Sequence, residues 1–331
     1  MHFGSGLERP PKTPFPPAPR RTPSALDSVE YAIELVELYW ASLLRDVPFA
    51  HFATYATAQA AANELSALAA AHPGKYAGPL DAAGNVTPGD RLFRGGLNAM
   101  LGYFEGETFG PYLSQFCMIP AMLGRVPLDQ KIKTYMPGKD FMTKQCDFDN
   151  IQQGADPTEV AVFDDLHRYM RTGRDTSAYT QVDELYQAYL IAYLVAIGIR
   201  IPANPGNPYA NGTYKNEKAF GTLGGPDIAA TLGAVARAAI NAVWYRKWRV
   251  HLKHRPEAGG GIVQLLKNGM LNATDKAKLA NFNIVLNSAA LNLSFLRNGS
   301  YLLSQAFPRV RQPTPPIRPD TAPSPAPVSR S

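Results

Sequence analysis

Five basic side chains crowd one ten-residue stretch at the end of an apolar segment: Arg246, Lys247, Arg249, Lys253 and Arg255. Lys247 and Arg255 lie eight residues apart, which on an ideal helix is a rise of roughly 12 Å and an offset of about 80°. Because Pro256 disfavours the α conformation at the residue before it, we expect the helix to fray at Arg255. The two long side chains can then converge on one point near the end of the helix.

This pair of side chains suits a small oxyanion, because arginine offers a planar fork of donors and lysine a compact charge. Basic residues at a helix C-terminus are also favoured by the helix dipole without any ligand. The residues alone therefore leave two interpretations open: an oxyanion site, or a helix end stabilised by its own charges.

The order of residues around the pair resembles the first vanadate-binding motif of the vanadium-dependent haloperoxidases, in its algal and bacterial bromoperoxidase form. The matching residues are Lys247-Trp248-x-Val250-His251-x3-Arg255-Pro256-Glu257-Ala258-x-Gly260-Gly261. The family belongs to a superfamily shared with the type 2 phosphatidic-acid phosphatases. Further stretches resemble the same family, in order, between about residue 25 and Pro308: Val36-Glu37-Leu38-Tyr39-Trp40, Leu44-Arg45-Asp46-Val47-Pro48-Phe49, Leu92-Phe93-Arg94-Gly95, Gly110-Pro111-Tyr112-Leu113-Ser114-Gln115-Phe116, Asp140-Phe141-Met142-Thr143, Gly173-Arg174-Asp175 and Phe220-Gly221-Thr222. Together these stretches favour the oxyanion site.

The resemblance implies a vanadate cofactor, held in a helical bundle by lysine and arginine side chains and by a histidine from a later motif. The vanadium remains V(V) and acts as a Lewis acid on hydrogen peroxide, so that a halide is oxidised and an organic acceptor is halogenated. Lys247 would bond a vanadate oxygen and polarise the peroxide, and Arg255 would neutralise the equatorial oxygens. Arg246 falls where the family tunes halide preference, and Glu257 would be a partner of Arg255. His251 and His254 do not match ligand positions, and we expect them to be structural.

The later motifs of the family are absent from this sequence. One is a Pro-[Ser/Ala/Thr]-Gly-His stretch and the other an Arg with a Gly-Val-His stretch that supplies the axial histidine. No histidine follows His254. Residues 301–308 still resemble the family, whereas the sequence from Arg309 onward does not. We therefore expect an incomplete copy of the enzyme that is inactive as written.

Two alternatives remain beside the haloperoxidase. Lys247 and Arg255 would bind phosphate as well as vanadate, so a phosphatase of the same superfamily is the second candidate. The third candidate is a non-catalytic helical remnant that serves in assembly, since the family forms homo-oligomers through its helices.

The elements that must position the site are predicted to be helices, so the fold class is all-α. The resemblance implies the helical bundle of the haloperoxidases and type 2 phosphatidic-acid phosphatases, without its C-terminal part. Ser28 can cap the expected helix over 28–44, and Asp227 the expected helix over 228–254. The expected helix over 181–197 is apolar almost all round and is expected to be buried. The expected helices cover residues 28–44, 54–71, 160–170, 181–197, 228–254 and 276–296, with long loops over 73–112 and 202–225.

Composition sets the domain limits and excludes some classes of function. Residues 1–25 and 309–331 hold 14 of the 29 prolines and a net charge of +3 each, so we expect irregular tails around a neutral helical domain over 26–308. Basic charge in tails gives no basic face for nucleic acid. No uninterrupted apolar run is long enough to span a membrane, and no signal segment is visible at Met1, so the compartment stays open. Cys117 and Cys146 form no metal or disulfide pattern and are expected to be buried thiols.

The tail after Pro308 generates the first prediction, a frameshift near Arg309. Codons compatible with Val310 to Thr321, read in a shifted frame, permit Gly-Ser-Pro-Thr-His-Pro-Ala-Tyr-Pro-Thr-Gly-His, which resembles the missing second motif. Sequencing the gene across codons 305–325 and beyond should then reveal this stretch, and further on an Arg and a Gly-Val-His stretch, in another frame. If no frame contains them, the proline-rich tail is genuine.

Because the helices of an incomplete copy would lack their packing partners and expose apolar faces, we also predict poor solubility of the isolated chain; a soluble monomer that unfolds cooperatively would contradict this.

Overall fold

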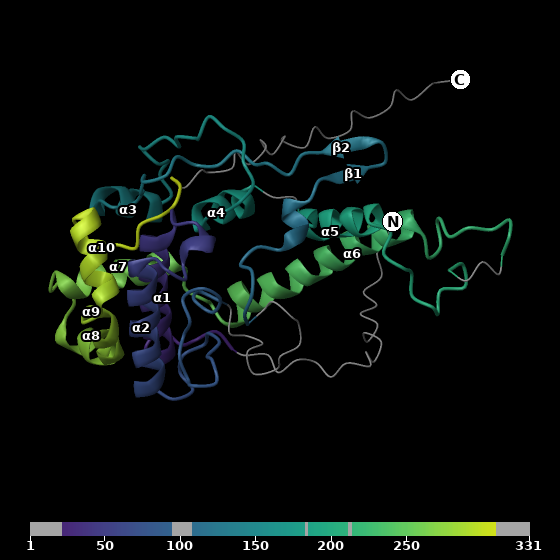
Figure 1. Ribbon diagram of the computed structural model, residues 1–331. Helices are drawn as coiled ribbons and strands as arrows, with labels where there is room; N and C mark the ends of the chain where they lie inside the picture. The colour runs from purple at the N-terminus through teal and green to yellow at the C-terminus, as the bar shows by residue number, and fades with distance from the viewer. Residues whose placement is uncertain (1–21, 95–107, 183–184, 211–213, 309–331) are drawn as a thin grey trace, which may run out of the picture.

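The computed structural model describes residues 22–94, 108–182, 185–210 and 214–308, and its regular secondary structure is almost entirely helical (Figure 1). The predicted all-α class is confirmed, with one antiparallel hairpin of two short strands as the exception. The predicted irregular tails lie outside the described residues, apart from residues 22–25. The elements outside the first two helices are η1 Phe49–His51, η2 Gln115–Met118, β1 Ala121–Leu123, β2 Val126–Leu128, α3 Gln145–Gln152, α4 Gly173–Gln181, α5 Gln187–Gly198, α6 Gly225–Trp244, η3 Tyr245–Val250, α7 Pro256–Lys267, α8 Ala273–Lys278, η4 Ala280–Phe282, α9 Asn283–Leu286 and α10 Ala289–Asn298.

The central helix of the main bundle is α1 (Val29–Leu44), which packs against α2 (Ala56–Ala71), α7, α9 and α10. It begins as predicted, because the Ser28 hydroxyl accepts a hydrogen bond from the Tyr31 N–H at 3.1 Å. Burial of a large apolar side chain contributes about 1.5–3 kcal/mol, so this helix supplies much of the bundle's stability. Its fully buried side chains are Ile33, Leu35, Val36, Tyr39, Trp40 and Leu44.

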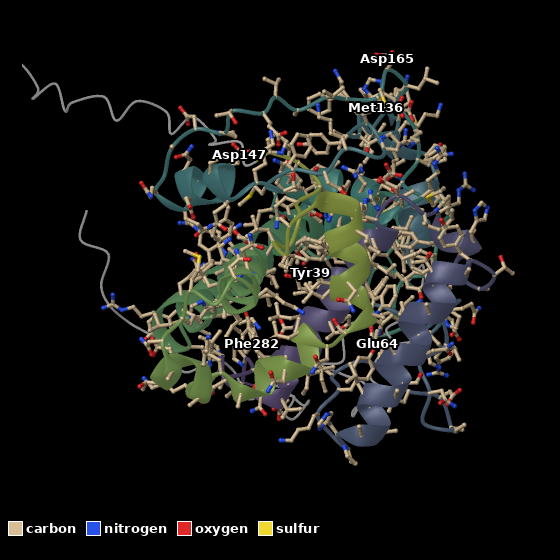
Figure 2. All side chains as sticks on the ribbon, turned by 90° about the vertical axis from the view of Figure 1, so that its left-hand side faces the viewer. Tyr39, Glu64, Met136, Asp147, Asp165 and Phe282 are labelled. Atoms are coloured by element: carbon tan, nitrogen blue, oxygen red, sulfur yellow. The ribbon has the colours of Figure 1, made fainter. Side chains whose placement is uncertain are left out.

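A glutamate of α2 joins three helices of the bundle. The Glu64 carboxylate accepts a hydrogen bond from the Trp40 indole N–H at 2.6 Å. It also accepts the backbone N–H groups of Ala289 (2.7 Å) and Ala290 (3.3 Å), which are unpaired donors at the start of α10. Glu64 lies between these helices, beside the bundle core that contains Tyr39 and Phe282 (Figure 2). The carboxylate therefore fixes how α1, α2 and α10 meet.

The pair α5 and α6 extends away from the main bundle (Figure 1). The prediction that the helix over 181–197 is buried is wrong, since α5 begins only at Gln187 and buries only Leu194 and Val195. In α6, Ala236 alone is buried. The reason is that α5 packs on α6, β1 and η2, and that within the described part of the chain neither α5 nor α6 packs extensively on the helices of the main bundle.

The exposed helix from Gly225 to Val250 is long and apolar enough to cross a membrane by length and composition alone. Its mean hydropathy is 1.2 over the best window, of which 6% is buried. A count of uninterrupted apolar residues missed it because Asp227 and Arg237 fall within it. Length and composition alone do not distinguish a membrane-spanning helix from an apolar helix that packs against protein, so the expectation of no membrane span stays a prediction.

Two other helix predictions are wrong. Residues 160–170 form no helix, because the backbone pairs with the preceding chain: the Val162 carbonyl accepts from the Met136 N–H at 2.9 Å, and the Arg168 N–H donates to the Ile132 carbonyl at 3.1 Å. Residues 276–296 form no single helix but fall within α8, η4, α9 and α10. The break before α10 comes where the Ser288 hydroxyl accepts the Leu291 N–H at 3.2 Å and starts a new helix.

Neither cysteine is buried, which contradicts the expectation for both. Cys117 in η2 is half-buried, and burial raises the pKa of its thiol. Cys146 is exposed because α3 lies on the surface of the bundle. Both are free thiols.

A cluster of buried charges ties the end of α1 to three later segments. Asp140 lies within 3.4 Å of Arg45 at the end of α1, 3.3 Å of Arg174 in α4 and 2.8 Å of Arg297 in α10. Arg174 also pairs with Asp46 at 2.9 Å and donates to the Ala306 carbonyl at 2.8 Å. Arg174 is completely buried, so its charge has to be compensated by these partners.

Removal of the shared carboxylate should therefore destabilise the whole bundle. We predict that Asp140→Asn lowers the free energy of unfolding by about 3 kcal/mol, because it leaves buried arginine charge uncompensated. Denaturant unfolding measures the effect. The matched control is Asp129→Asn, since that carboxylate is 65% exposed and pairs with Lys131 at 3.9 Å. We expect a change below about 0.5 kcal/mol there, and an equal loss in both variants would contradict the prediction.

Candidate oxyanion site

The predicted motif lies across a break between two helices. α6 runs directly into η3, a π-helical turn over Tyr245–Val250 that contains Lys247. The helix ends at Val250 rather than at His254 as predicted, because the chain turns at Leu252, whose φ is +46°. The N–H groups of His251 and Lys253 close this turn on the carbonyls of Arg246 (2.9 Å) and Lys247 (3.0 Å).

Arg255 lies on the far side of the break. Its backbone is extended (φ −76°, ψ 152°), and it is followed by Pro256, the first residue of α7. The predicted departure of Arg255 from the α conformation is thus confirmed. Lys247 and Arg255 therefore come from two elements joined by a short loop, so the geometry of that loop decides whether their side chains converge.

A buried carboxylate holds the Arg255 guanidinium. Glu257, in the first turn of α7, is 7% exposed and forms an ion pair with the Nε of Arg255. The arginine side chain is 52% exposed. The pair uses Nε, so Glu257 does not occupy the two terminal nitrogens of the guanidinium. Glu257 thus contacts Arg255 as predicted.

Lys247 presents its ammonium group to solvent. The residue is exposed, and its Nζ lies 4.6 Å from the centroid of the Trp248 ring. Within the described part of the chain, no carboxylate pairs with this group. Arg246 is half-buried, and its Nη2 lies 3.4 Å from the His251 ring nitrogen Nε2. His251 thus contacts Arg246, consistent with its expected structural role.

Contacts with α1 that sequence reasoning missed hold the loop between Lys247 and Arg255. The Lys253 Nζ donates to both carboxylate oxygens of Glu34, at 2.8 and 2.9 Å, and lies 5.3 Å from the centroid of the Tyr31 ring. Burial raises the pKa of Tyr31 to about 12, and the negative charges of Glu34 and Glu257 act in the same direction. The only local signal was that Tyr31 and Glu34 lie three residues apart, and therefore on one face of α1.

Three consecutive glycines let α7 approach its neighbours closely. A Cβ at Gly259 would lie 2.5 Å from the Tyr31 hydroxyl, and one at Gly260 would lie 2.5 Å from the Leu303 backbone nitrogen. A Cβ at Gly261 would lie 2.6 Å from the Phe148 ring. Glycine weakens a helix interior, so its presence here reflects close packing. The start of α7, and with it Glu257, is thereby fixed against α1.

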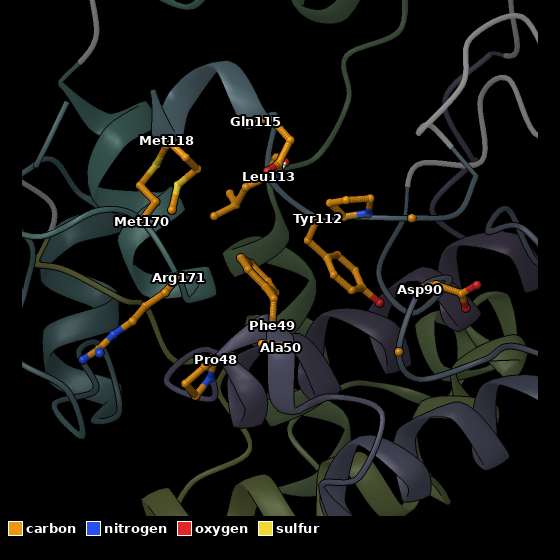
Figure 3. A pocket seen from close by; sticks show the side chains of 13 residues that line it. Pro48, Phe49, Ala50, Asp90, Tyr112, Leu113, Gln115, Met118, Met170 and Arg171 are labelled. Atoms are coloured by element: carbon orange, nitrogen blue, oxygen red, sulfur yellow. Dashed lines mark hydrogen bonds between the residues drawn. The ribbon is translucent and has the colours of Figure 1, made fainter. Parts of the chain in front are cut away.

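A cavity of the described chain lies away from the motif. It has a volume of about 560 Å³ and lies between η1 and the segment around Tyr112 (Figure 3). Phe49 and Tyr112 stack in it at 5.0 Å, and its lining contains neither Lys247 nor Arg255. Asp90 and Arg171 are the charged residues of this lining, so the cavity offers no pair of cations for an oxyanion.

Comparison with known proteins adds evidence of ancestry. The chain is 31% identical over 301 residues to a vanadium-dependent bromoperoxidase from Ascophyllum nodosum, covering 89% of this chain and 51% of that protein. It is 30% identical over 288 residues to the enzyme of the same name from Corallina officinalis, covering 76% and 46%. The solved homohexameric structure of the second vanadate-dependent bromoperoxidase of Ascophyllum nodosum matches with a TM-score of 0.70 at 30% identity, over 87% of this chain and 47% of that one. Over most of its length, this chain is a homologue of vanadium-dependent bromoperoxidases.

The resemblance inferred from the motifs is thus confirmed for this haloperoxidase homologue. No family model matches the chain. The chain spans about half the length of the curated bromoperoxidases that it matches. Over the described residues, no group of three or more histidine, cysteine, aspartate or glutamate side chains could hold a metal ion.

The glycines of α7 give a prediction with an internal control. We expect Gly260→Ala to lower the free energy of unfolding by about 1–2 kcal/mol, because the new methyl group meets the Leu303 backbone, which outweighs the gain in helix propensity. A methyl group on Gly233 in α6 would meet nothing within 4 Å, so Gly233→Ala should stabilise the helix by up to about 1 kcal/mol. Chemical denaturation of the two variants compares them directly; stabilisation by both would show that α7 does not need its close contact.

Proposed function

We propose that this haloperoxidase homologue binds vanadate through Lys247 and Arg255, and that this binding serves halide oxidation by hydrogen peroxide. The observation that supports the proposal is the pairing of the half-exposed Arg255 side chain with the buried Glu257, together with an exposed Lys247 that no carboxylate among the described residues pairs with. Glu257 compensates the charge of Arg255, so the net positive charge of Lys247, Arg255 and Glu257 together is small. Such a site suits a small oxyanion that carries exchangeable protons and therefore a low net charge.

The residues fit the oxyanion side of the cofactor. Lys247 and Arg255 would donate charge-assisted hydrogen bonds to its oxygens. Bound vanadium(V) supplies Lewis-acid activation of hydrogen peroxide. Arg246, held beside His251, would influence which halide approaches. These residues supply contacts to the oxyanion and no axial ligand, so vanadate binding is the property by which they are tested.

Vanadate binding tests the assignment of the two cations. Two charge-assisted hydrogen bonds of about 2 kcal/mol each correspond to a dissociation constant on the order of 1 mM. We expect Lys247→Ala and Arg255→Ala each to weaken binding at least about tenfold, measured by titration of the ⁵¹V nuclear magnetic resonance line or by competition with phosphate. Lys276→Ala, which removes an exposed lysine of α8, is the matched control and should leave binding unchanged.

Two activity assays separate the haloperoxidase from the phosphatase alternative. Bromination of a phenolic dye with vanadate, peroxide and bromide, at a rate above free vanadate and dependent on Lys247, would support halide oxidation. Hydrolysis of a phosphate ester that depends on Lys247 would support the phosphatase. If vanadate binding is equal in wild type, Lys247→Ala and Arg255→Ala, the site assignment is wrong.

The partners follow from the same family. We infer that the chain assembles into a homo-oligomer, because the structurally similar bromoperoxidase from Ascophyllum nodosum is a homohexamer. The support in this chain is the exposed apolar surface of α6, with Val235 at 61% and Trp244 at 56% exposure. Apolar surface of this extent favours contact with another polypeptide. Hydrogen peroxide, a halide and an organic acceptor would be the reactants.

A further inference from the structure

The loop between the two proposed vanadate-binding cations is held in an unfavourable conformation. Leu252 has a φ of +46° although it is a leucine, and 71% of it is exposed, so its own side chain does not compensate the strain. Such a conformation persists only where the surrounding contacts impose it. Some other contact must therefore hold the loop.

The two ends of this loop are anchored unequally. On one side Glu257 and the glycines fix the start of α7 against α1. On the other side the loop continues from η3 and α6, which are largely exposed and share few contacts with the main bundle. Arg255 thus lies at the fixed end, whereas Lys247 lies at the end that the bundle does not restrain directly.

Lys253 is the residue of the loop that reaches back to the bundle. Its ammonium group donates to both oxygens of Glu34 and lies over the Tyr31 ring, and both partners belong to α1. The lysine side chain is 20% exposed and the glutamate side chain 34%, so solvent screens the pair only in part. The backbone N–H of Lys253 also donates to the Lys247 carbonyl at 3.0 Å. A single residue therefore couples α1 to the backbone of Lys247.

We propose that Glu34 is a positioning residue for the oxyanion site: it holds Lys253 and thereby fixes the loop that connects Lys247 to Arg255. The inference rests on the proposed function of Lys247 and Arg255. Glu34 has a second effect, because it compensates the charge of Lys253 within the protein.

A charge-swap cycle tests this role in the full chain. The variants are Glu34→Gln, Lys253→Gln, the double variant, and the swap Glu34→Lys with Lys253→Glu, each titrated with vanadate. We expect each single variant to weaken vanadate binding about two- to fivefold, the double variant to be no weaker than the singles, and the swap to restore most of the affinity. Rescue by the swap is a result that loss of the side chains' packing alone would not give.

The matched control lies on the same helix. Glu30 pairs with Lys75 at 2.8 Å, away from the motif loop, so Glu30→Gln should leave vanadate affinity unchanged. Two results would overturn the proposal. Stronger binding in Glu34→Gln together with weaker binding in Lys253→Gln would show that Lys253 contacts the anion itself. Equal affinity in wild type and Glu34→Gln would show that the ion pair does not position the site.

Amide hydrogen exchange without vanadate separates this proposal from the proposed function. We expect exchange at His251 and Lys253, whose amides close the turn, to rise about two- to fivefold in Glu34→Gln, with α2 unchanged. If wild type binds no vanadate but this exchange still rises, the vanadate assignment fails while the loop anchor stands. If exchange does not change, the anchor itself is refuted.

Discussion

The Asp140 carboxylate forms ion pairs with three arginines from three different segments, and the main bundle depends on this compensation of their charges. Arg45 ends α1, Arg174 lies in α4 and Arg297 lies in α10, so no two of them are neighbours in the sequence. Burial lowers the pKa of Arg45 to about 10, an effect that Asp140 opposes and that Arg174 and Arg297 reinforce. Three of the family-like stretches, around Arg45, Asp140 and Arg174, therefore meet at one point. In this chain, these three stretches are joined by ion pairs that connect the segments of the bundle.

Local signals predicted the fold where a helix carries its own start and end. Ser28 predicted the beginning of α1, and the proline and glycine after residue 71 predicted the end of α2. Local signals failed where distant backbone groups competed. Residues 160–170 have helical spacing of apolar side chains, yet their carbonyls and N–H groups pair with residues 132–136. The apolar composition of α5 suggested that the helix is buried. Burial depends on neighbouring elements, however, and the sequence pattern of a helix does not show whether such neighbours are present.

The motif was predictable at the level of residues and not at the level of geometry. Lys247, Arg255 and Glu257 were identified because the order of residues resembles the family's motif, and the contact between Arg255 and Glu257 was expected from that resemblance. The π-helical turn and the left-handed Leu252 were missed, because the spacing of basic residues is the same on an unbroken helix. The pair of Glu34 and Lys253 spans 219 residues of sequence. A contact of that range leaves no local pattern at either end.

The glycines of α7 make the motif dependent on its surroundings. Their missing side chains are complementary to the Tyr31 hydroxyl, the Leu303 backbone and the Phe148 ring, which belong to three other parts of the chain. A designer who transplanted residues 247–261 alone onto another pair of helices would carry the cations and leave behind the surface that orients them. The smallest part of this site that could be transferred to another protein is a helix pair together with its contact surface. A short peptide with the same residues would lack the contacts that orient the cations.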